Sequence, residues 1–306
     1  VYMSDIDFYN GLVAIVGEKN VRTDEPLKLH TTFKIGGPAD YFVKPSDSVQ
    51  IASIINLCRD NEVPWFILGN GSNLLVSDSG YRGVVINIAD NMNRISVDGE
   101  RITAQAGAML IKVSGTARDN SLTGMEFASG IPGTVGGAVY MNAGAYGGDM
   151  SGVVSKVTAL TQAGEVCEID GKDMKFAYRH SIIEENDLIV LEVVIELKRG
   201  DMYEINCRMK ELSDARRSKQ PLEYPSAGST FKRPEGYFAG KLIMDAGLRG
   251  YSVGGAQISE KHCGFVVNKG GATASDVVTL IQDVQDRVQN AFGVRLDTEV
   301  KTLGDF

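Results

Sequence analysis

The sequence of 306 residues has only four cysteines and three histidines, and it lacks an apolar run of about 18 residues that could cross a membrane. Its cysteines form no CxxC pair and no metal-ligand spacing, which argues against both a disulfide framework and a zinc or other metal site. Cysteine use of this kind is typical of the reducing cytoplasm, so we expect a cytoplasmic protein without a bound metal. The cysteines are Cys58, Cys167, Cys207 and Cys263.

An excess of positive charge is also absent. The chain has 31 Lys and Arg against 39 Asp and Glu, a net charge of −8. This balance argues against nucleic acid or an anionic membrane as the main partner, although it allows a local basic pocket for a phosphorylated ligand. The first residues lack the basic and then apolar pattern of a signal peptide, so no leader is expected. We therefore expect a monomer that binds a small molecule.

The hydrophobic fraction of 43% indicates a globular protein, and the length is enough for two or three domains. Hydrophobic periodicity and turn residues divide the chain into zones 1–80, 81–200 and 201–306. The first zone has a βαβ-like pattern. It predicts, in order, a strand pair within 26–45 around a turn at 36–38, a helix from Asp47 or Ser48 to before Pro64, and strands at 65–68 and 74–76.

The second zone is rich in strands, and the third is rich in helices. The composition changes near Gly200, which we take as the domain boundary. In the second zone we expect one helix at about 109–120 and strands at 81–88, 94–99, 101–107, 154–161, 164–170 and 188–198. In the third zone we expect helices at 203–220, 238–248 and 273–294, the last with Val277, Val278, Ile281, Val284, Val288 and Phe292 on one face.

Glycine is unusually dense in two loops. Ser129 to Asp149 contains seven glycines, and a shorter loop after the strand at 65–68 reads Gly69-Asn70-Gly71-Ser72-Asn73. Without Cβ atoms, neighbouring backbone N–H groups can approach a single anion closely. Neither loop has the spacing of a P-loop or of a dinucleotide fingerprint. The pattern favours a pyrophosphate cradle outside the Rossmann context, with a pair of tight β-turns as the alternative.

Several motifs resemble those of a known family, the UDP-N-acetylenolpyruvoylglucosamine reductases (MurB). The FAD-binding half of that family is similar to TTFKIGGPADYFV, LGNGSNLLV and GIPGTVGGAVYMNAGAYGG. Its later motifs are similar, in order, to YRHSII, SKQPLEYPSAGSTFKRP, AGKLI, HCGFVVN and FGVRLDTEV. The resemblance extends from about Pro26 to Val300. The connection from Gly148 to Arg179 is short, which is similar to the second, shorter class of the family.

The resemblance implies an α+β flavoenzyme with the FAD-binding fold of the vanillyl-alcohol-oxidase type. Two α+β subdomains, 1–80 and 81–200, would bind FAD, and an α+β C-terminal domain, 201–306, would hold the substrate. FAD should be noncovalent, because neither glycine loop contains His or Cys. The implied reaction uses NADPH as co-substrate and reduces UDP-N-acetylglucosamine enolpyruvate to UDP-N-acetylmuramate, a step of peptidoglycan synthesis for the cell wall.

Three residues match the catalytic residues of the family. Arg179 would hold the substrate carboxylate and stabilise the developing enolate, while Glu299 would polarise the same carboxylate. Ser229 would donate the proton, and Glu299 or a water that it holds stays open as an alternative donor. From the residues alone, each has an ordinary interpretation. These are a surface salt bridge for Arg179, a solvated carboxylate for Glu299 and a turn serine for Ser229.

The resemblance also implies binding residues. For the substrate these are Tyr178, Lys219, Arg233, Lys241 and Asn268, with Lys219 and Arg233 placed against the diphosphate. Arg216 and Arg217 instead have the pattern of a solvated helix face. For FAD they are Gly69, Asn70, Gly71, Ser72, Asn73, Gly133, Thr134, Gly136, Gly137, Ala143, Gly144, Ala145 and Tyr146. We expect the N–H groups of Gly136 and Gly137 to approach the pyrophosphate, because no side chain shields them.

Two other functions compete with this prediction. An FAD-dependent oxidase of the same fold, acting on a sugar or alcohol, would share the glycine loops but would not need the Arg179 and Glu299 pair. A nucleotide-sugar binding protein without catalysis would not need the flavin. Oxygen consumption with a sugar would favour the oxidase, and a colourless protein that cannot be reconstituted with FAD would favour the binding protein.

Overall fold

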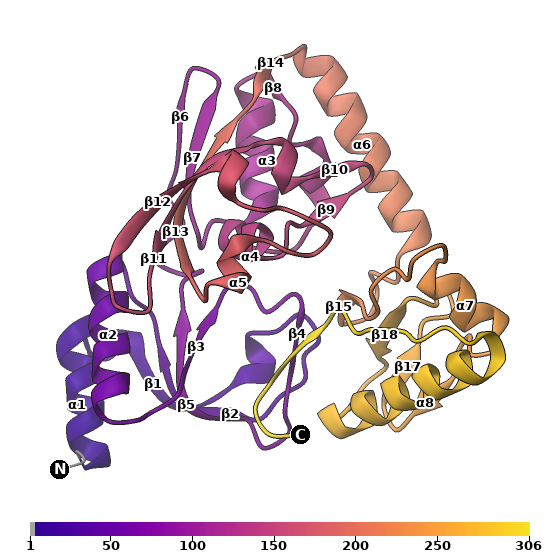
Figure 1. Ribbon diagram of the computed structural model, residues 1–306, viewed down its shortest axis with the longest axis horizontal. Helices are drawn as coiled ribbons and strands as arrows, with labels where there is room; N and C mark the ends of the chain where they lie inside the picture. Colours follow the sequence, from indigo (N-terminus) through magenta and orange to yellow (C-terminus); the bar gives the residue numbers. More distant parts are fainter. Residues whose placement is uncertain (1–3) are drawn as a thin grey trace. The chain divides into compact units, whose positions relative to one another are not determined.

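The computed structural model describes residues 4–306 (Figure 1), and the chain divides into two compact units with separate hydrophobic cores. The units differ from the zones expected from the sequence. Two stretches of the first zone, 24–40 and 71–82, belong with the C-terminal residues, and the last division follows Arg216 rather than Gly200. The first unit comprises Val1–Thr23, Tyr41–Asn70 and Gly83–Arg216, and the second comprises Asp24–Asp40, Gly71–Arg82 and Arg217–Phe306.

The N-terminal part of the chain forms a four-stranded sheet in the order β1-β2-β5-β3, in which β3 and β5 are parallel. Helices α1 and α2 lie side by side (Figure 1). Asp47, one of the two predicted start residues, is the N-cap of α2, because its carboxylate accepts the N–H of Gln50 at 2.9 Å. The elements are α1 (Asp5–Val16), η1 (Glu18–Asn20), β1 (Val21–Pro26), β2 (Pro38–Val43), α2 (Ser48–Asp60), β3 (Trp65–Leu68) and β5 (Tyr81–Asn87).

A five-stranded antiparallel sheet follows in the first unit, in the order β12-β11-β13-β7-β6. The expected strands of the second zone are confirmed. Burial alternates along β7, where Ile102 and Ala104 lie in the core and Arg101 is exposed. The strands are β6 (Ile95–Asp98), β7 (Arg101–Gln105), β11 (Val154–Leu160), β12 (Val166–Asp170) and β13 (Ile189–Glu196).

The glycine-rich stretch contains a short helix, α4 (Val135–Tyr140), although the sequence predicted a loop there. Thr134 caps the helix, and a Cβ on Gly136 would lie 2.9 Å from the Cβ of Ala106, so glycine lets the helix pack closely against its neighbour. The predicted helices α3 (Leu110–Asp119) and α6 (Met202–Lys219) are confirmed. The remaining elements of this region are β8 (Leu122–Thr123), η3 (Glu126–Gly130), β9 (Gly144–Ala145), β10 (Gly148–Asp149), η4 (Met150–Gly152), η5 (Gly171–Asp173), α5 (Ile182–Glu185) and β14 (Lys198–Arg199).

The second unit has its own four-stranded antiparallel sheet, ordered β15-β18-β17-β16, which α8 contacts. A capping box of Thr273 and Asp276 begins α8, and Gly293 ends it in the left-handed conformation. The elements are η2 (Leu27–Leu29), β4 (Leu74–Val76), β15 (Ser226–Ser229), α7 (Ala239–Asp245), β16 (Ser252–Val253), β17 (Ala256–Ile258), β18 (Phe265–Asn268), α8 (Ala274–Phe292) and β19 (Lys301–Leu303), with β19 parallel to β4.

The strand pair predicted within 26–45 is wrong in its first half. Only β2 is a strand there, and the residues before it form η2 and a turn in which Lys34 has φ +58°. The alternating apolar residues Leu27, Phe33 and Ile35 suggested a strand. They are buried in the second unit without a partner strand in the described part of the chain, so burial and not pairing explains the pattern.

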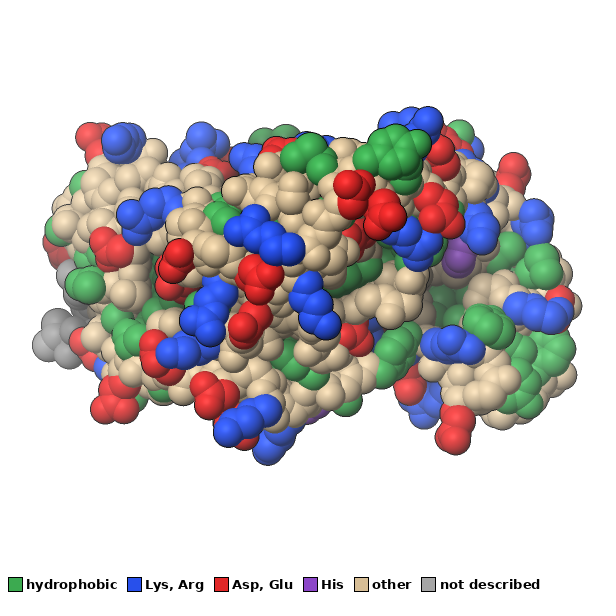
Figure 2. Space-filling view, turned by 90° about the horizontal axis from the view of Figure 1, so that it is seen from above, with side chains coloured by type: hydrophobic (Ala, Val, Ile, Leu, Met, Phe, Trp, Pro, Cys, Tyr) green, Lys and Arg blue, Asp and Glu red, His purple; other side chains and the backbone are tan. Residues whose placement is uncertain are grey.

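The surface in Figure 2 carries Lys and Arg side chains interspersed with Asp and Glu. This face has no continuous basic area of the kind that binds a polyanion. Among the described residues, no helix is long and apolar enough to span a membrane. No group of three His, Cys, Asp or Glu side chains in residues 4–306 is placed to hold a metal ion.

Candidate functional site

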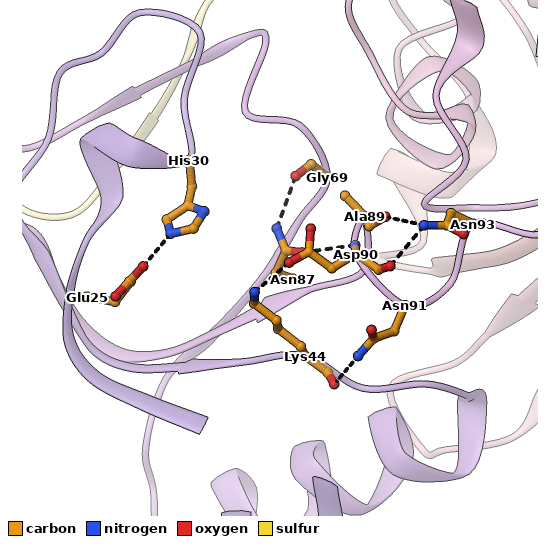
Figure 3. Close-up of polar contacts among 9 residues, drawn as sticks. All are labelled: Glu25, His30, Lys44, Gly69, Asn87, Ala89, Asp90, Asn91 and Asn93. Carbon is orange, nitrogen blue, oxygen red and sulfur yellow. Dashed lines mark hydrogen bonds and ion pairs between the residues drawn. The ribbon is translucent and has the colours of Figure 1, made fainter. Parts of the chain in front are cut away.

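The two glycine-rich loops meet within the first unit. The Asn70 side-chain amide donates to the carbonyl of Pro132 at 2.6 Å. A Cβ on Gly69 would lie 2.5 Å from Oγ1 of Thr134, so only glycine fits there without displacement. The side-chain amide of the buried Asn87 donates to the Gly69 carbonyl at 3.4 Å (Figure 3). Two loops more than 60 residues apart in the sequence therefore contact each other and form one candidate site.

This place has unsatisfied backbone donors. Within residues 4–306, the backbone N–H groups of Gly69, Asn70, Gly133 and Thr134 donate no hydrogen bond. Thr134 is only 1% exposed, and a buried N–H without an acceptor is costly. Pairs of adjacent N–H groups in glycine loops are suited to phosphate oxygens. The residues present therefore fit the pyrophosphate of a dinucleotide cofactor such as FAD.

Gly136 and Gly137 do not supply free donors, in contrast to our expectation. The Gly136 N–H donates to the carbonyl of Ala106 at 2.8 Å, and the Gly137 N–H donates to Oγ1 of Thr134 at 3.4 Å. Both N–H groups are used to build and cap α4. The sequence could not show that the N–H groups of Gly136 and Gly137 differ from that of Gly133, because the difference depends on the position of helix α4.

The remaining predicted flavin residues fall in two places. Ala143, Gly144, Ala145 and Tyr146 form the hairpin of β9 and β10, whose turn places Tyr146 and Gly147 at positive φ. Gly71, Ser72 and Asn73 belong to the second unit.

Gly71 packs against the chain beside His30. A Cβ on Gly71 would lie 2.3 Å from the His30 carbonyl oxygen, and the His30 ring contacts the Glu25 carboxylate at 2.7 Å (Figure 3). Asn73 instead joins the segment of Glu299, because its side-chain amide donates to the Glu299 carbonyl at 3.0 Å.

Arg179 lies at the tip of a tight turn in the first unit. Ala177 and His180 exchange two backbone hydrogen bonds, of 3.1 and 3.2 Å, which leaves Tyr178 and Arg179 as the two turn residues. The guanidinium carbon of Arg179 lies 5.1 Å from the centre of the Tyr178 ring, and Tyr178 is exposed. A cation beside an exposed aromatic ring at a turn tip suits recognition of an anionic ligand.

The segments that carry Ser229 and Glu299 pair in the second unit. The N–H of Glu299 donates to the carbonyl of Thr230 at 2.8 Å, directly after Ser229. The pairing of β15 with β18 is irregular between Ser226 and Ser229, and Gly228 lies there with φ +77°. A bulge of this kind redirects the following side chain, and such bulges are frequent beside active sites.

The four other substrate candidates, all in the second unit, differ in what their side chains already contact. Lys219 is exposed at the end of α6, and the Arg233 guanidinium lies 4.0 Å from the centre of the Phe238 ring. Lys241 forms an exposed ion pair of 2.6 Å with Asp245.

Asn268 is buried, and its side chain is used within the fold. Its amide donates to the Phe33 carbonyl at 3.2 Å, and its oxygen accepts the N–H groups of Gly270 and Ala272 at 2.9 and 3.2 Å. These bonds give Asn268 a structural role.

Arg216 is the residue that sequence reasoning missed. We expected a solvated side chain, but Arg216 is half-buried, and a Cβ on Gly130 would lie 2.7 Å from its guanidinium nitrogen. Burial lowers the pKa of Arg216, and the nearby Tyr146 opposes that shift. A signal existed: Arg216 follows the buried Leu212 by four residues and so shares its helix face. Arg216, a half-buried cation beside the glycine-rich stretch, is therefore a further candidate for binding an anionic cofactor.

Comparison with known proteins identifies the class. Residues 39–170 match the family described as FAD binding domain. The structure of UDP-N-acetylenolpyruvylglucosamine reductase (MurB) from Thermus caldophilus superimposes with a TM-score of 0.79 at 36% identity, covering 93% of this chain and 98% of that one. Alkyldihydroxyacetonephosphate synthase, at 18% identity, shares the fold alone over 65% of this chain and 42% of its own, with a TM-score of 0.51. Fold and glycine loops together define an α+β flavoprotein with an FAD-binding fold of the vanillyl-alcohol-oxidase type.

The sequence relatives then specify the family. Residues 220–303 match the C-terminal domain of UDP-N-acetylenolpyruvoylglucosamine reductase. The reductase of Clostridium tetani is 49% identical over 98% of this chain and 97% of its own. That of Agathobacter rectalis is 55% identical over 92% of this chain and 94% of its own. The chain belongs to the UDP-N-acetylenolpyruvoylglucosamine reductase family.

Proposed function

We propose that this chain reduces UDP-N-acetylglucosamine enolpyruvate to UDP-N-acetylmuramate for peptidoglycan synthesis, with NADPH as the reductant. The observation that carries the proposal is the identity of about half of all residues to named reductases over nearly the whole chain. The free N–H groups of Gly133 and Thr134 support the binding of FAD. FAD, when bound, supplies the hydride, because no amino-acid side chain can donate one.

The substrate dictates what the side chains must do. Its double bond is conjugated to a carboxylate, so a hydride that adds to the carbon remote from the carboxylate leaves negative charge on the adjacent carbon. The Arg179 guanidinium holds that carboxylate and stabilises the enolate. Ser229 donates a proton to the carbon next to the carboxylate, and Glu299 polarises the carboxylate or holds a water near Ser229. The hydrogen bond from the Glu299 N–H to the carbonyl of Thr230, the residue after Ser229, supports a joint role for Glu299 and Ser229.

The diphosphate of the substrate needs cations. Lys219 and Arg233 are both exposed in the second unit, and we assign them to this role. Arg233 lies over the Phe238 ring, which presents an aromatic face and a positive charge together. Although residues 24–40 and 71–82 fold with the second unit, we assign residues 1–80 and 81–200 to FAD binding and 201–306 to the substrate, with Arg179 as a residue of 81–200 that also binds the substrate. The protein is proposed to act in the cytoplasm as a monomer, with the enolpyruvyl ether of a UDP-sugar as its small-molecule substrate.

One experiment tests the function against its rivals. The purified protein should show the visible absorption bands of a flavin, and it should oxidise NADPH in a one-to-one ratio with the enolpyruvyl substrate. Steady oxygen consumption with a sugar and no NADPH would instead indicate an oxidase. A protein that stays colourless after incubation with FAD but binds UDP-sugars would indicate a binding protein. Either result would refute the reductase assignment.

A further inference from the structure

Arg179 occupies a backbone conformation that an arginine rarely adopts. Its φ is +55°, in the left-handed region, and the turn around it is closed by the mutual bonds of Ala177 and His180. A residue with a Cβ is disfavoured there, so a turn of this kind persists only when neighbouring contacts hold it. Two of the contacts that hold this turn lead to the end of helix α4.

The first contact is made by Asn142. Its side-chain amide donates to the Ala177 carbonyl at 3.1 Å, and its side-chain oxygen accepts the N–H of Ser151 at 3.0 Å. Asn142 is only 5% exposed and itself has φ +43°. The buried side chain of Asn142, within the glycine-rich stretch, thereby connects the base of the Arg179 turn to Ser151.

The second contact is made by Ser181, two residues after Arg179. Its hydroxyl donates to the Tyr140 carbonyl at 2.9 Å, and the side chain is fully buried. The turn is therefore fastened on both sides, through Ala177 and through Ser181, to residues 140–142. Tethers on both sides of a two-residue turn restrict its rotation far more than one tether would, because a single hydrogen bond still acts as a pivot.

We propose that Asn142 is a positioning residue, whose carboxamide holds the Arg179 turn so that the guanidinium meets the substrate carboxylate. The inference rests on the role of Arg179 in the proposed function. An amide suits the task because it supplies a donor for Ala177 and an acceptor for Ser151 at once. A carboxylate of the same shape keeps the bond from Ser151 but puts a negative charge against the Ala177 carbonyl.

The test is the isosteric variant Asn142→Asp. We expect normal FAD content and normal bleaching of the flavin by NADPH. Reoxidation by the enolpyruvyl substrate should be about 10- to 100-fold slower, the effect expected of a catalytic group misplaced by about 1 Å. Hydrogen exchange at the amides of Ala177 and His180 should accelerate, which reports the turn without reference to activity.

A matched control is Asn20→Asp. Asn20 is in the same unit, and its amide donates to the Val16 carbonyl at 2.7 Å, so the change removes a similar bond far from Arg179 in the sequence. Both half-reactions should then stay normal. If Asn142→Asp does not fold, Ser181→Ala takes its place, because it removes only the second tether and should slow reoxidation selectively.

A double-mutant cycle with Arg179→Lys separates positioning from general damage. If Asn142 acts through Arg179, Asn142→Asp should have little further effect on reoxidation in the Arg179→Lys protein. Additive effects, or equal slowing of both half-reactions, would overturn the inference. Normal reoxidation in Asn142→Asp, with Arg179→Lys impaired, would also overturn it and leave the proposed function intact. Normal reoxidation in Arg179→Lys alone would refute the role of Arg179, and the inference with it.

Discussion

The backbone N–H of Glu299 donates to the carbonyl of Thr230 at 2.8 Å, which ties a glutamate near the C-terminus to the residue directly after Ser229. Ser229 and Glu299 are 70 positions apart in the sequence. The bridge between Phe231 and Thr298 continues the same pairing. Because these two segments pair, we expect the Ser229 hydroxyl and the Glu299 carboxylate to act together in the proposed reaction.

Ser229→Ala should separate the two halves of catalysis. FAD binding and bleaching by NADPH should be normal, because the proton is needed only by the enolpyruvyl substrate. Reoxidation should slow by about 10²–10⁴-fold, the usual contribution of general acid catalysis. Ser229→Cys should recover part of the rate, because a thiol is the stronger acid.

Stopped-flow absorbance of each half-reaction is the measurement for Ser229. Ser252→Ala, an exposed serine of the same sheet, is the control and should behave normally. If Ser229→Ala reoxidises within a few-fold of the natural rate, Ser229 is not the proton donor. The proton would then have to come from Glu299 or from a water that Glu299 holds.

Gly69→Ala should yield a folded protein that has lost its flavin. The new Cβ would stand 2.5 Å from Oγ1 of the buried Thr134, so the two loops must separate where their free N–H groups lie. The ratio of visible to protein absorbance measures FAD content, and circular dichroism checks the fold. The control is Gly115→Ala in α3, where a Cβ meets nothing within 4 Å and should stabilise the helix by about 0.8–1 kcal/mol. A yellow, fully loaded Gly69→Ala protein would contradict the cradle.

Lys219→Gln and Arg233→Gln should weaken binding of the UDP-sugar, each by about 1–3 kcal/mol, as expected for lost charge-assisted hydrogen bonds. Reduction by NADPH should change less. Calorimetric titration with the product, UDP-N-acetylmuramate, gives the affinity, and Lys28→Gln, an exposed lysine of the same unit, is the control. Unchanged affinity, or equal losses in both half-reactions, would exclude these residues from diphosphate binding.

Cys58 should be inert in the folded protein. Burial raises the pKa of its thiol from 9.0 to about 12, and the side chain is fully buried in the first core. A shift of this size lowers the thiolate fraction about 1000-fold at neutral pH. Alkylation followed by mass spectrometry should label the exposed Cys207 first and Cys58 only after unfolding. Equal labelling rates in the folded protein would contradict this prediction.

The same shift predicts the effect of pH on stability. The folded pKa of Cys58 is raised, so the contribution of the neutral thiol is fully present below the unfolded value of 9.0. It should be lost as the pH rises from 9.0 toward about 12, because the unfolded chain then releases a proton that the folded chain retains. Denaturant unfolding of Cys58→Ala should be less dependent on pH over that range than unfolding of the natural protein.

The sequence alone determined the elements whose cause is local. Helix α2 begins directly after Asp47 because the Asp47 carboxylate caps it, and α8 runs between a capping box and Gly293 with Val277 and Val288 buried. The buried face predicted for α8 was wrong at its C-terminal end, since Phe292 is exposed. The motifs that carry the family resemblance are likewise contiguous, so FAD and the reaction class could be predicted without coordinates.

Only the tertiary structure decided which groups meet and which donors stay free. The N–H of Gly133 is available and that of Gly136 is not, because Gly136 bonds to Ala106 on a distant segment. Arg216 is half-buried although its neighbour Arg217 is exposed. These outcomes depend on contacts between residues far apart in the chain, and periodicity and spacing record only the preferences of residues a few positions apart.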